Sequence, residues 1–202
     1  MTSRLNTTKN CAVIILAAGQ SNRLGKPKQL LKYQNKALLQ HAIDTAKQSS
    51  VQSIIVVLGS NADIILNKVD ISGTRMVKNT DWQNGMASTI GCGIRALLEL
   101  DSTIDSAILM VCDQPFVTSD LLNSLIEKQK ETGKSIIASQ YGDTIGTPAL
   151  FHKLFFAELM ALKGDNGAKK IMMQHNDLLA TVPFPEGSID IDTIDDYKAL
   201  GE

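Results

Sequence analysis

A loop rich in positive charge follows a predicted strand near the start of the chain. The apolar run 11–18 is typical of a buried β-strand, and glycine, serine and proline break that pattern over 19–28. The loop carries three cations and no acid, namely Arg23, Lys26 and Lys28. Free backbone N–H groups and fixed positive charge at a strand end are what a polyphosphate needs. The segment therefore predicts a polyphosphate site, with an ordinary solvated loop as the alternative.

The spacing in this loop excludes two common phosphate-binding motifs. Five residues separate Gly19 from Gly25, and Pro27 follows Lys26, so the Walker A pattern is absent. Ser21 stands where a dinucleotide-binding loop has its second glycine. Small residues at the end of the strand still let a ligand approach the backbone closely. A phosphate site here would therefore have its own arrangement of small residues and cations.

A carboxylate follows a second predicted strand. Asp113 comes directly after the apolar run 107–112, whose carboxyl end shares one edge of the expected sheet with the cationic loop. A carboxylate there can hold Mg²⁺, which keeps waters and substrate phosphates as its other ligands. It can equally cap the turn before Pro115. The spacing leaves both roles open.

Two further segments carry polar residues at predicted helix starts. Near the end of the chain, alternation over a predicted strand at 188–191 places Asp190 and Asp192 on one face, and Asp192 or Thr193 can also N-cap the last helix. In the segment 79–89, Gly85 and Ser88 open a predicted helix whose free N–H groups can contact a base or ribose. Ser88 suits an N-cap equally well. The single tryptophan of this segment is expected to pack rather than to stack on a base.

The elements that position these residues alternate along the chain. Predicted strands lie at 11–18, 53–58, 75–78, 107–112, 135–141, 147–151, 178–184 and 188–191. Predicted helices lie at 37–49, 61–68, 90–98, 121–133, 155–164, 167–175 and 193–200. Continuously apolar strands between helices indicate a Rossmann-like three-layer α/β/α fold with a mainly parallel sheet. One of the strands in 135–151 is expected to run antiparallel.

Composition narrows the class of protein. The 202 residues suit one domain over 1–202, with the polar residues 1–10 as a flexible tail. A net charge of −1 gives no general attraction to nucleic acid or to an anionic membrane, and no apolar run approaches the roughly 20 residues that span a bilayer. A cytoplasmic protein is expected. Cys11 and Cys112 fall in apolar runs and are expected to be buried thiols, and no zinc-ligand spacing occurs.

Several motifs resemble those of one family in the same order along the chain. The string LAAGQSNRLGKPKQLL at 16–31 resembles the signature of the MobA-like nucleotidyltransferases, and in particular the molybdenum cofactor cytidylyltransferase branch. CDQP at 112–115, NTDWQNGMAS at 79–88 and DIDTIDDY at 190–197 match further family motifs, as do GTPALF at 146–151 and GDNGA at 164–168. The departures are small, since Leu24 replaces a frequent methionine and Thr147 varies within its motif.

This resemblance implies a role for each motif residue. It implies nucleotide contacts from Leu16, Ala17, Ala18, Gly19, Arg23, Lys28, Gly85 and Ser88. It implies that Arg23 and Lys28 stabilise charge during catalysis and that Asp113 and Asp192 converge on one Mg²⁺. The acceptor side would include Gly146, Pro148, Gly164 and Asp165.

The reaction implied is Mg²⁺-dependent transfer of CMP from CTP to the phosphate of molybdopterin, with release of pyrophosphate. Transfer to methylerythritol phosphate or to a sugar phosphate is the alternative within the same chemistry. A different class is a maturation factor that carries finished cofactor to a molybdoenzyme of the xanthine dehydrogenase type. A nucleotide-binding module without catalysis is a third possibility. A module that only binds a nucleotide would not need two cations and two acids together.

Overall fold

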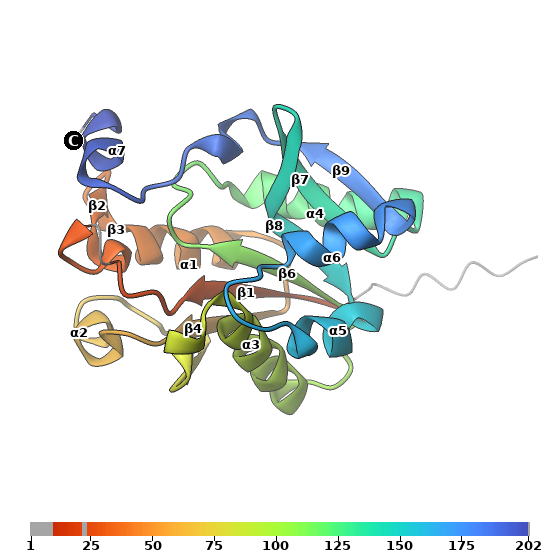
Figure 1. Ribbon diagram of the computed structural model, residues 1–202, viewed down its shortest axis with the longest axis horizontal. Coiled ribbons are helices and arrows are strands. Elements are labelled where there is room, and N and C mark those ends of the chain that lie inside the picture. The colour runs from red at the N-terminus through yellow and green to blue at the C-terminus, as the bar shows by residue number, and fades with distance from the viewer. Residues whose placement is uncertain (1–9, 22–23, 202) are drawn as a thin grey trace, which may run out of the picture.

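A seven-stranded sheet runs through the centre of the molecule (Figure 1). The computed structural model describes residues 10–21 and 24–201. The strands are β1 (Cys11–Ala17), β4 (Ser53–Leu58), β5 (Arg75–Lys78), β6 (Ser106–Val111), β7 (Ile136–Tyr141), β8 (Thr144–His152) and β9 (Leu179–Pro183). Their order is β5-β4-β1-β6-β8-β7-β9, in which β8 runs antiparallel to β6 and β7 while the other neighbours pair parallel. The predicted mainly parallel sheet with one antiparallel strand is confirmed.

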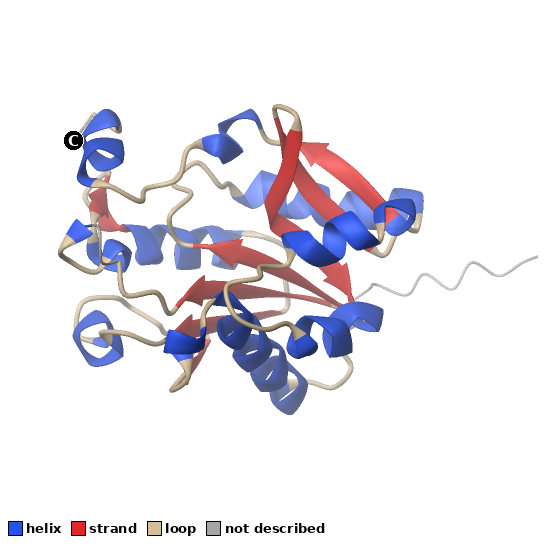
Figure 2. Ribbon diagram, in the orientation of Figure 1, coloured by secondary structure: helices blue, strands red, loops and turns tan. Residues whose placement is uncertain are grey.

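Helices cover both faces of this sheet, so the three-layer architecture is also confirmed (Figure 2). One face carries α1 (Leu38–Gln48), α2 (Ala62–Leu66) and α4 (Ser119–Thr132). The other face carries α3 (Met86–Leu100), α5 (Phe156–Ala161) and α6 (Lys169–Gln174). Alternate residues of β1 explain the division, since Val13 packs with the first group and Ile14 with the second. Every residue of β1 is buried, as expected for a strand covered on both sides.

Local capping sets the helix ends. The Thr118 hydroxyl accepts a hydrogen bond from the Leu121 N–H and begins α4, and Gly133, with φ of 67°, ends it as the sequence predicts. Of the two candidate caps for the last helix, α7 (Ile194–Ala199), Thr193 takes the role, in a capping box with Asp196. Asp192 therefore remains available for another partner.

Two features of the chain differ from the sequence prediction. No strand forms at 188–191, because the 3-10 helix η6 (Pro185–Ser188) turns the chain there and the Ile191 N–H donates to the carbonyl of Asp113 instead of to a sheet partner. The predicted alternation is also wrong, since Ile189 is 44% exposed while Ile191 is fully buried. A small hairpin that the patterns did not predict, β2 (Lys32–Tyr33) and β3 (Lys36–Ala37), precedes α1.

Short 3-10 helices form part of four other connections. They are η2 (Lys28–Leu30), η3 (Trp82–Asn84), η4 (Lys153–Phe155) and η5 (Asn176–Leu178). Cys11 and Cys112 are buried free thiols as predicted, and burial raises the pKa of each to about 12. None of the described helices has the length and apolar character to cross a membrane.

Candidate functional site

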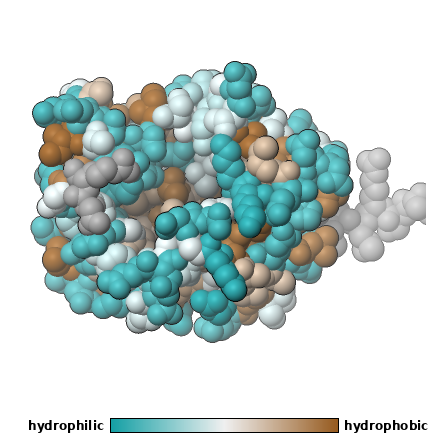
Figure 3. Space-filling model, in the orientation of Figure 1, coloured by the Kyte–Doolittle hydropathy of each residue, from teal (hydrophilic) through white to brown (hydrophobic). Residues whose placement is uncertain are grey.

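A cavity of 490 Å³ lies at the carboxyl ends of β1 and β6. Three parts of the chain line most of it: the end of β1 with the turn that follows, the start of α3, and the residues after β6. On the face shown in Figure 3, apolar residues lie at the bottom of a hollow that hydrophilic residues surround. The residues predicted from motifs that line the cavity are Leu16, Ala17, Ala18, Gly19, Lys28, Gly85, Asp113 and Asp165. The tertiary structure thus brings together residues from four distant segments of the chain.

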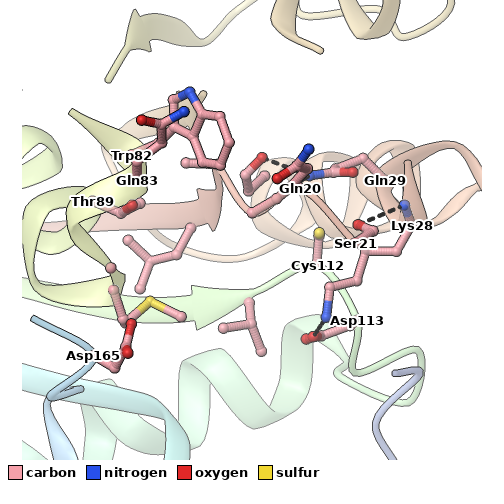
Figure 4. Close-up of a pocket in the computed structure, with 17 residues that line it drawn as sticks. Gln20, Ser21, Lys28, Gln29, Trp82, Gln83, Thr89, Cys112, Asp113 and Asp165 are labelled. Carbon is pink, nitrogen blue, oxygen red and sulfur yellow. Dashed lines mark hydrogen bonds and ion pairs between the residues drawn. The ribbon is translucent and has the colours of Figure 1, made fainter. Parts of the chain in front are cut away.

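Lys28 joins the two predicted metal ligands. Its Nζ donates to Oδ2 of Asp113 at 2.5 Å and to Oδ1 of Asp192 at 2.9 Å (Figure 4 shows the contact with Asp113). Since both oxygens bond to the same nitrogen, they can be no farther apart than these two distances combined. The side chains of Lys28 and Asp113 are 18% and 14% exposed, and that of Asp192 is 35% exposed. Carboxylates 79 positions apart in sequence therefore meet at one ammonium group.

Backbone contacts hold this arrangement in place. The N–H of Lys28 donates to Oγ of Ser21 at 3.0 Å, which fixes the start of η2 against the turn. The N–H of Ile191 donates to the carbonyl of Asp113 at 3.0 Å, which brings Asp192 alongside. Lys26, another cation of the loop, lies over the Tyr197 ring with 5.4 Å from its Nζ to the ring centroid. The cationic loop is thereby tied to both the Asp113 segment and α7.

Burial and the charges of Asp113 and Asp192 together shift the pKa values of two neighbouring side chains, Lys28 and Asp190. Burial alone would lower the pKa of Lys28, but the charge of Asp113 and the hydrogen bonds to Asp113 and Asp192 outweigh it and hold that pKa above its ordinary value. Partial burial raises the pKa of the nearby Asp190 carboxyl, and the charges of Asp192 and Asp113 raise it further. Lys28 is therefore a fixed cation in a strongly acidic corner of the site.

The donor set at this corner suits a divalent metal ion. Oδ1 of Asp113 is buried and has no hydrogen-bond partner among the described residues, so one carboxylate oxygen remains available. Carboxylate oxygens are the hard ligands that Mg²⁺ and Mn²⁺ take, and Mg²⁺ commonly uses only one or two of them with waters and substrate phosphates. Within the described part of the chain no group of three or more acids, histidines or cysteines forms a closed metal site. The arrangement fits a metal that binds together with a phosphate ligand.

The start of α3 packs closely against the loop at 164–165. Gly85 has φ of 87°, a left-handed conformation that favours glycine, and an added Cβ would overlap Asp165 and the backbone of Gly164. The N–H of Ala87 donates to the carbonyl of Gly164 at 3.1 Å. Asp165, predicted on the acceptor side, therefore lines the same cavity as the residues predicted to contact nucleotide. Gly164 lines only a neighbouring cavity of 510 Å³.

Ser88 does not cap α3, because Gly85 is the N-cap residue. The Ser88 hydroxyl lies within hydrogen-bond distance of the carbonyls of Asp81 and Gly85, both at 2.9 Å, and it accepts from the Asn79 amide. It lines the neighbouring 510 Å³ cavity rather than the one that holds Lys28. Trp82 lines the Lys28 cavity, although its Cβ also packs beside Gly59 (Figure 4).

The other residues predicted on the acceptor side belong to β8, and Val111 lines both the Lys28 cavity and the apolar cavity at the start of β8. Gly146 lines an apolar cavity of 230 Å³ that also includes Leu16, Met86 and Tyr141. An added Cβ at Gly146 would overlap the Tyr141 hydroxyl, so glycine is needed for the ring to lie there. Pro148 is buried at an irregularity of the β7–β8 pairing, where its carbonyl accepts from the Ser139 hydroxyl, and it lines none of these three cavities.

Arg23 lies outside the described residues, so its role remains a prediction from the resemblance of its motif. Several cavity residues were not predicted to take part, namely Gln20, Gln29, Gln83 and Thr89. Gln29 stands directly beside Lys28, and that position was the one available signal. The others lie next to motif residues but have no spacing that distinguishes them from surface residues.

Comparison with family models matches residues 13–178 to the MobA-like NTP transferase domain. Nicotine blue oxidoreductase from Paenarthrobacter nicotinovorans is 26% identical over 199 residues, which cover 93% of this chain and 94% of that protein. A probable molybdenum cofactor guanylyltransferase from Bacillus mycoides (strain KBAB4) is 26% identical over 152 residues, which cover 75% of this chain and 73% of that protein. The chain is thus similar to one protein named as an oxidoreductase and to another named as a guanylyltransferase.

Solved structures share the fold over nearly the whole chain. The crystal structure of the homolog of Mycobacterium tuberculosis Rv0371c from Mycobacterium sp. strain JC1 has a TM-score of 0.81 and 31% identity, and 94% of each chain is covered. Rv0371c from Mycobacterium tuberculosis H37Rv in complex with manganese has a TM-score of 0.78 and 28% identity, with 95% of this chain and 97% of that chain covered. A divalent metal is therefore present in the structure of one such relative.

Proposed function

This chain belongs to the MobA-like NTP transferase family, and we propose that it transfers CMP from CTP to the terminal phosphate of molybdopterin. An oxygen of the acceptor phosphate attacks the α-phosphorus in line, and the bond from that phosphorus to the pyrophosphate oxygen breaks. The products are the cytosine dinucleotide form of the cofactor and pyrophosphate. The observation that carries the proposal is the Lys28 ammonium between Asp113 and Asp192, at the edge of a cavity that a small-residue turn lines.

The residues of this chain act by positioning and by charge. Ala17, Ala18 and Gly19 let the triphosphate approach the backbone of the turn, and Lys28 neutralises negative charge that develops on the phosphates. Arg23 is proposed as a second cation for the same charge. The acceptor phosphate is already ionised at neutral pH, so no side-chain nucleophile is needed. The 230 Å³ cavity beside Gly146 offers an apolar surface for the body of the acceptor.

Asp113 and Asp192 would hold a divalent metal, which we propose to be Mg²⁺. When bound, such a metal supplies charge neutralisation to the phosphates and orients the attack. The ammonium group of Lys28 donates to both carboxylates, and since a lysine ammonium has three N–H donors it can also donate to a phosphate oxygen from this position. The manganese complex of a relative supports a divalent metal of this class.

Two lines of support favour molybdopterin and CTP over other substrates. The relative named as a probable molybdenum cofactor guanylyltransferase supports the acceptor. The LAAG sequence at 16–19 resembles the cytidylyl enzymes of the family, whereas guanylyl enzymes tend to carry LAGG. Methylerythritol phosphate and sugar phosphates are the competing acceptors, and a molybdoenzyme of the xanthine dehydrogenase type is the protein partner that the cofactor product would serve.

Exchange of radiolabelled pyrophosphate into nucleotide tests the proposal. With purified protein, Mg²⁺ and molybdopterin, we expect exchange into CTP to exceed exchange into GTP, ATP or UTP, and to disappear when the acceptor is omitted. A thermal-shift series with the same four nucleotides should give the largest increase in melting temperature with CTP, since ligands that bind the folded state stabilise it. Absence of exchange with every nucleotide and acceptor, despite cofactor binding, would favour a carrier protein.

A redox reaction is the second candidate, because a relative named as an oxidoreductase matches 93% of this chain. Electron transfer in the same cavity releases no pyrophosphate. The two candidates therefore give different results in the exchange experiment. The pairing of Lys28 with two carboxylates favours phosphoryl chemistry, because such a group neutralises phosphate and binds metal.

A further inference from the structure

Gln29 is a buried amide beside the catalytic lysine, and no motif assigns it a role. It lies in η2 and is 1% exposed. Its Nε2 donates two hydrogen bonds, to the carbonyl of Ala17 at 2.8 Å and to that of Gly19 at 3.0 Å. Figure 4 shows its amide directed at the turn that follows β1. One side chain therefore holds two carbonyls of the turn that is proposed to bind phosphate.

These two bonds set the direction of the N–H groups in the turn. In a planar trans peptide the C=O and the following N–H point in opposite directions. Because the carbonyls of Ala17 and Gly19 point to Gln29, the N–H groups of Ala18 and Gln20 point away from it. The orientation of both peptide groups therefore depends on the amide of Gln29.

The rest of the turn leaves its N–H donors unused. The carbonyl of Ala18 accepts from the N–H of Ser60 at 3.1 Å, so the peptide between the two held by Gln29 is also fixed. No described residue accepts a backbone hydrogen bond from Gly19, Gln20 or Ser21, and all three line the 490 Å³ cavity. The N–H groups of Gly19 and Gln20 belong to peptides whose carbonyls are held, so these two free donors have a fixed direction and suit an anion.

A hydrocarbon side chain at this position would leave two carbonyls without a donor and the peptide groups free to rotate. A carboxylate would repel both carbonyls and any phosphate beside them. The amide is suited to the position for this reason, even though its own Oε1 is buried without a partner among the described residues. On the basis of the proposed function, we propose that Gln29 is a positioning residue that presents the N–H groups of the turn to the triphosphate.

The chain offers a matched control in Gln129. This residue of α4 is also 1% exposed, its Oε1 accepts from the Ser106 hydroxyl at 3.0 Å, and its Nε2 has no partner in the described part of the structure. It lines none of the cavities around the site. Replacing either glutamine by methionine removes a buried amide of the same size, but only one replacement releases the turn.

The experiment compares Gln29→Met, Gln29→Glu and Gln129→Met in the full chain. The dissociation constants of Mg²⁺–CTP and of Mg²⁺–tripolyphosphate are measured by calorimetry, and the free energy of unfolding is measured in urea. We expect Gln29→Met to weaken both ligands by roughly tenfold or more, as for loss of hydrogen bonds to a charged ligand. Gln29→Glu, which keeps the size of the side chain, should weaken both further because it adds negative charge. Gln129→Met should bind both like the wild type.

Equal ligand affinity of Gln29→Met, Gln29→Glu and Gln129→Met would overturn the positioning role and leave Gln29 as a packing residue. Weakening of CTP with no change for tripolyphosphate would also overturn it, because the effect would then lie at the base or ribose. Wild-type protein that binds neither ligand would overturn the proposed function together with this inference. If Gln29→Met does not fold, Gln29→Glu against Gln129→Met decides the question by the same comparison.

Discussion

The two halves of the sheet carry different parts of the site. In the parallel half, β5-β4-β1-β6, the buried strands β1 and β6 lead into the turn at 18–21 and to Asp113, and charged side chains lie where these two strands end. In the other half, β8-β7-β9, the antiparallel strand β8, which pairs irregularly with β7, begins beside an apolar cavity that Tyr141 and Gly146 line. From this difference we propose that nucleotide chemistry lies mainly in the parallel half and acceptor choice mainly in the other half, so that the two can be altered separately.

Removal of the metal-binding charge should have the largest effect. We expect Asp113→Asn to reduce turnover by at least about 10²–10³-fold, the range found when a group that stabilises developing charge is lost. The same variant should lose affinity for Mn²⁺, measured by electron paramagnetic resonance in the presence of nucleotide. Asp195→Asn is the control, since that side chain is 93% exposed on α7. Near-normal turnover of Asp113→Asn would assign the chemistry to another part of the chain.

Removal of the Lys28 cation should reduce turnover by a comparable or slightly smaller factor, but it should increase the affinity for the metal ion. We expect Lys28→Met to reduce turnover by about 10²–10³-fold. In the absence of nucleotide it should bind Mn²⁺ more tightly than the wild type, because no ammonium group then competes for Asp113 and Asp192. Lys26→Met, which removes only a cation over Tyr197, should change neither quantity. Weaker Mn²⁺ binding by Lys28→Met would show that the lysine supports the metal site.

A change in the acceptor half should alter only the second substrate. We expect Gly146→Ala to displace the Tyr141 ring and to raise the KM for molybdopterin by about tenfold, since overpacking of this kind commonly costs 1–3 kcal/mol. Its dissociation constant for CTP should stay at the wild-type value. Gly91→Ala is the control, because Gly91 lines none of the cavities at the site and the nearest neighbour of its added Cβ is the end of the flexible Arg95 side chain at 3.3 Å. A parallel loss of CTP affinity would mean that the two halves are not independent.

The smallest effects are on stability, within the parallel half. An added Cβ at Gly93 lies 2.5 Å from Ile14 of β1, whereas at Gly91 its nearest neighbour is the end of the Arg95 side chain at 3.3 Å. We expect Gly93→Ala to lower the free energy of unfolding by roughly 1–3 kcal/mol despite its better helix propensity. Gly91→Ala should raise it by up to about 1 kcal/mol, the propensity gain alone. Urea unfolding measures both, and equal values would show that α3 does not pack tightly on β1.

Sequence patterns predicted the parallel half well and the chain after it less well. Within the parallel half, β1, β4 and β6 were recognised from continuous apolar runs, and α4 was recognised from its periodicity and its terminal Gly133. The segment 188–191 was predicted as a strand from the alternation of Asp190 and Asp192 with isoleucines, but a 3-10 helix precedes it and Ile191 bonds to Asp113. Alternation over four residues does not distinguish a strand from an extended loop, because both place alternate side chains on opposite sides.

Residue types and spacing were enough for the fold class and for the seven strands of the main sheet, and the resemblance of short motifs to a known family selected Lys28, Asp113 and Asp192. These depend on local periodicity and on short motifs, which are properties of neighbouring residues. Only the folded chain decides that one ammonium group joins both carboxylates, and that Gln29 holds the turn. Those contacts join residues up to 164 positions apart, and their distances depend on how the strands pack rather than on any local pattern.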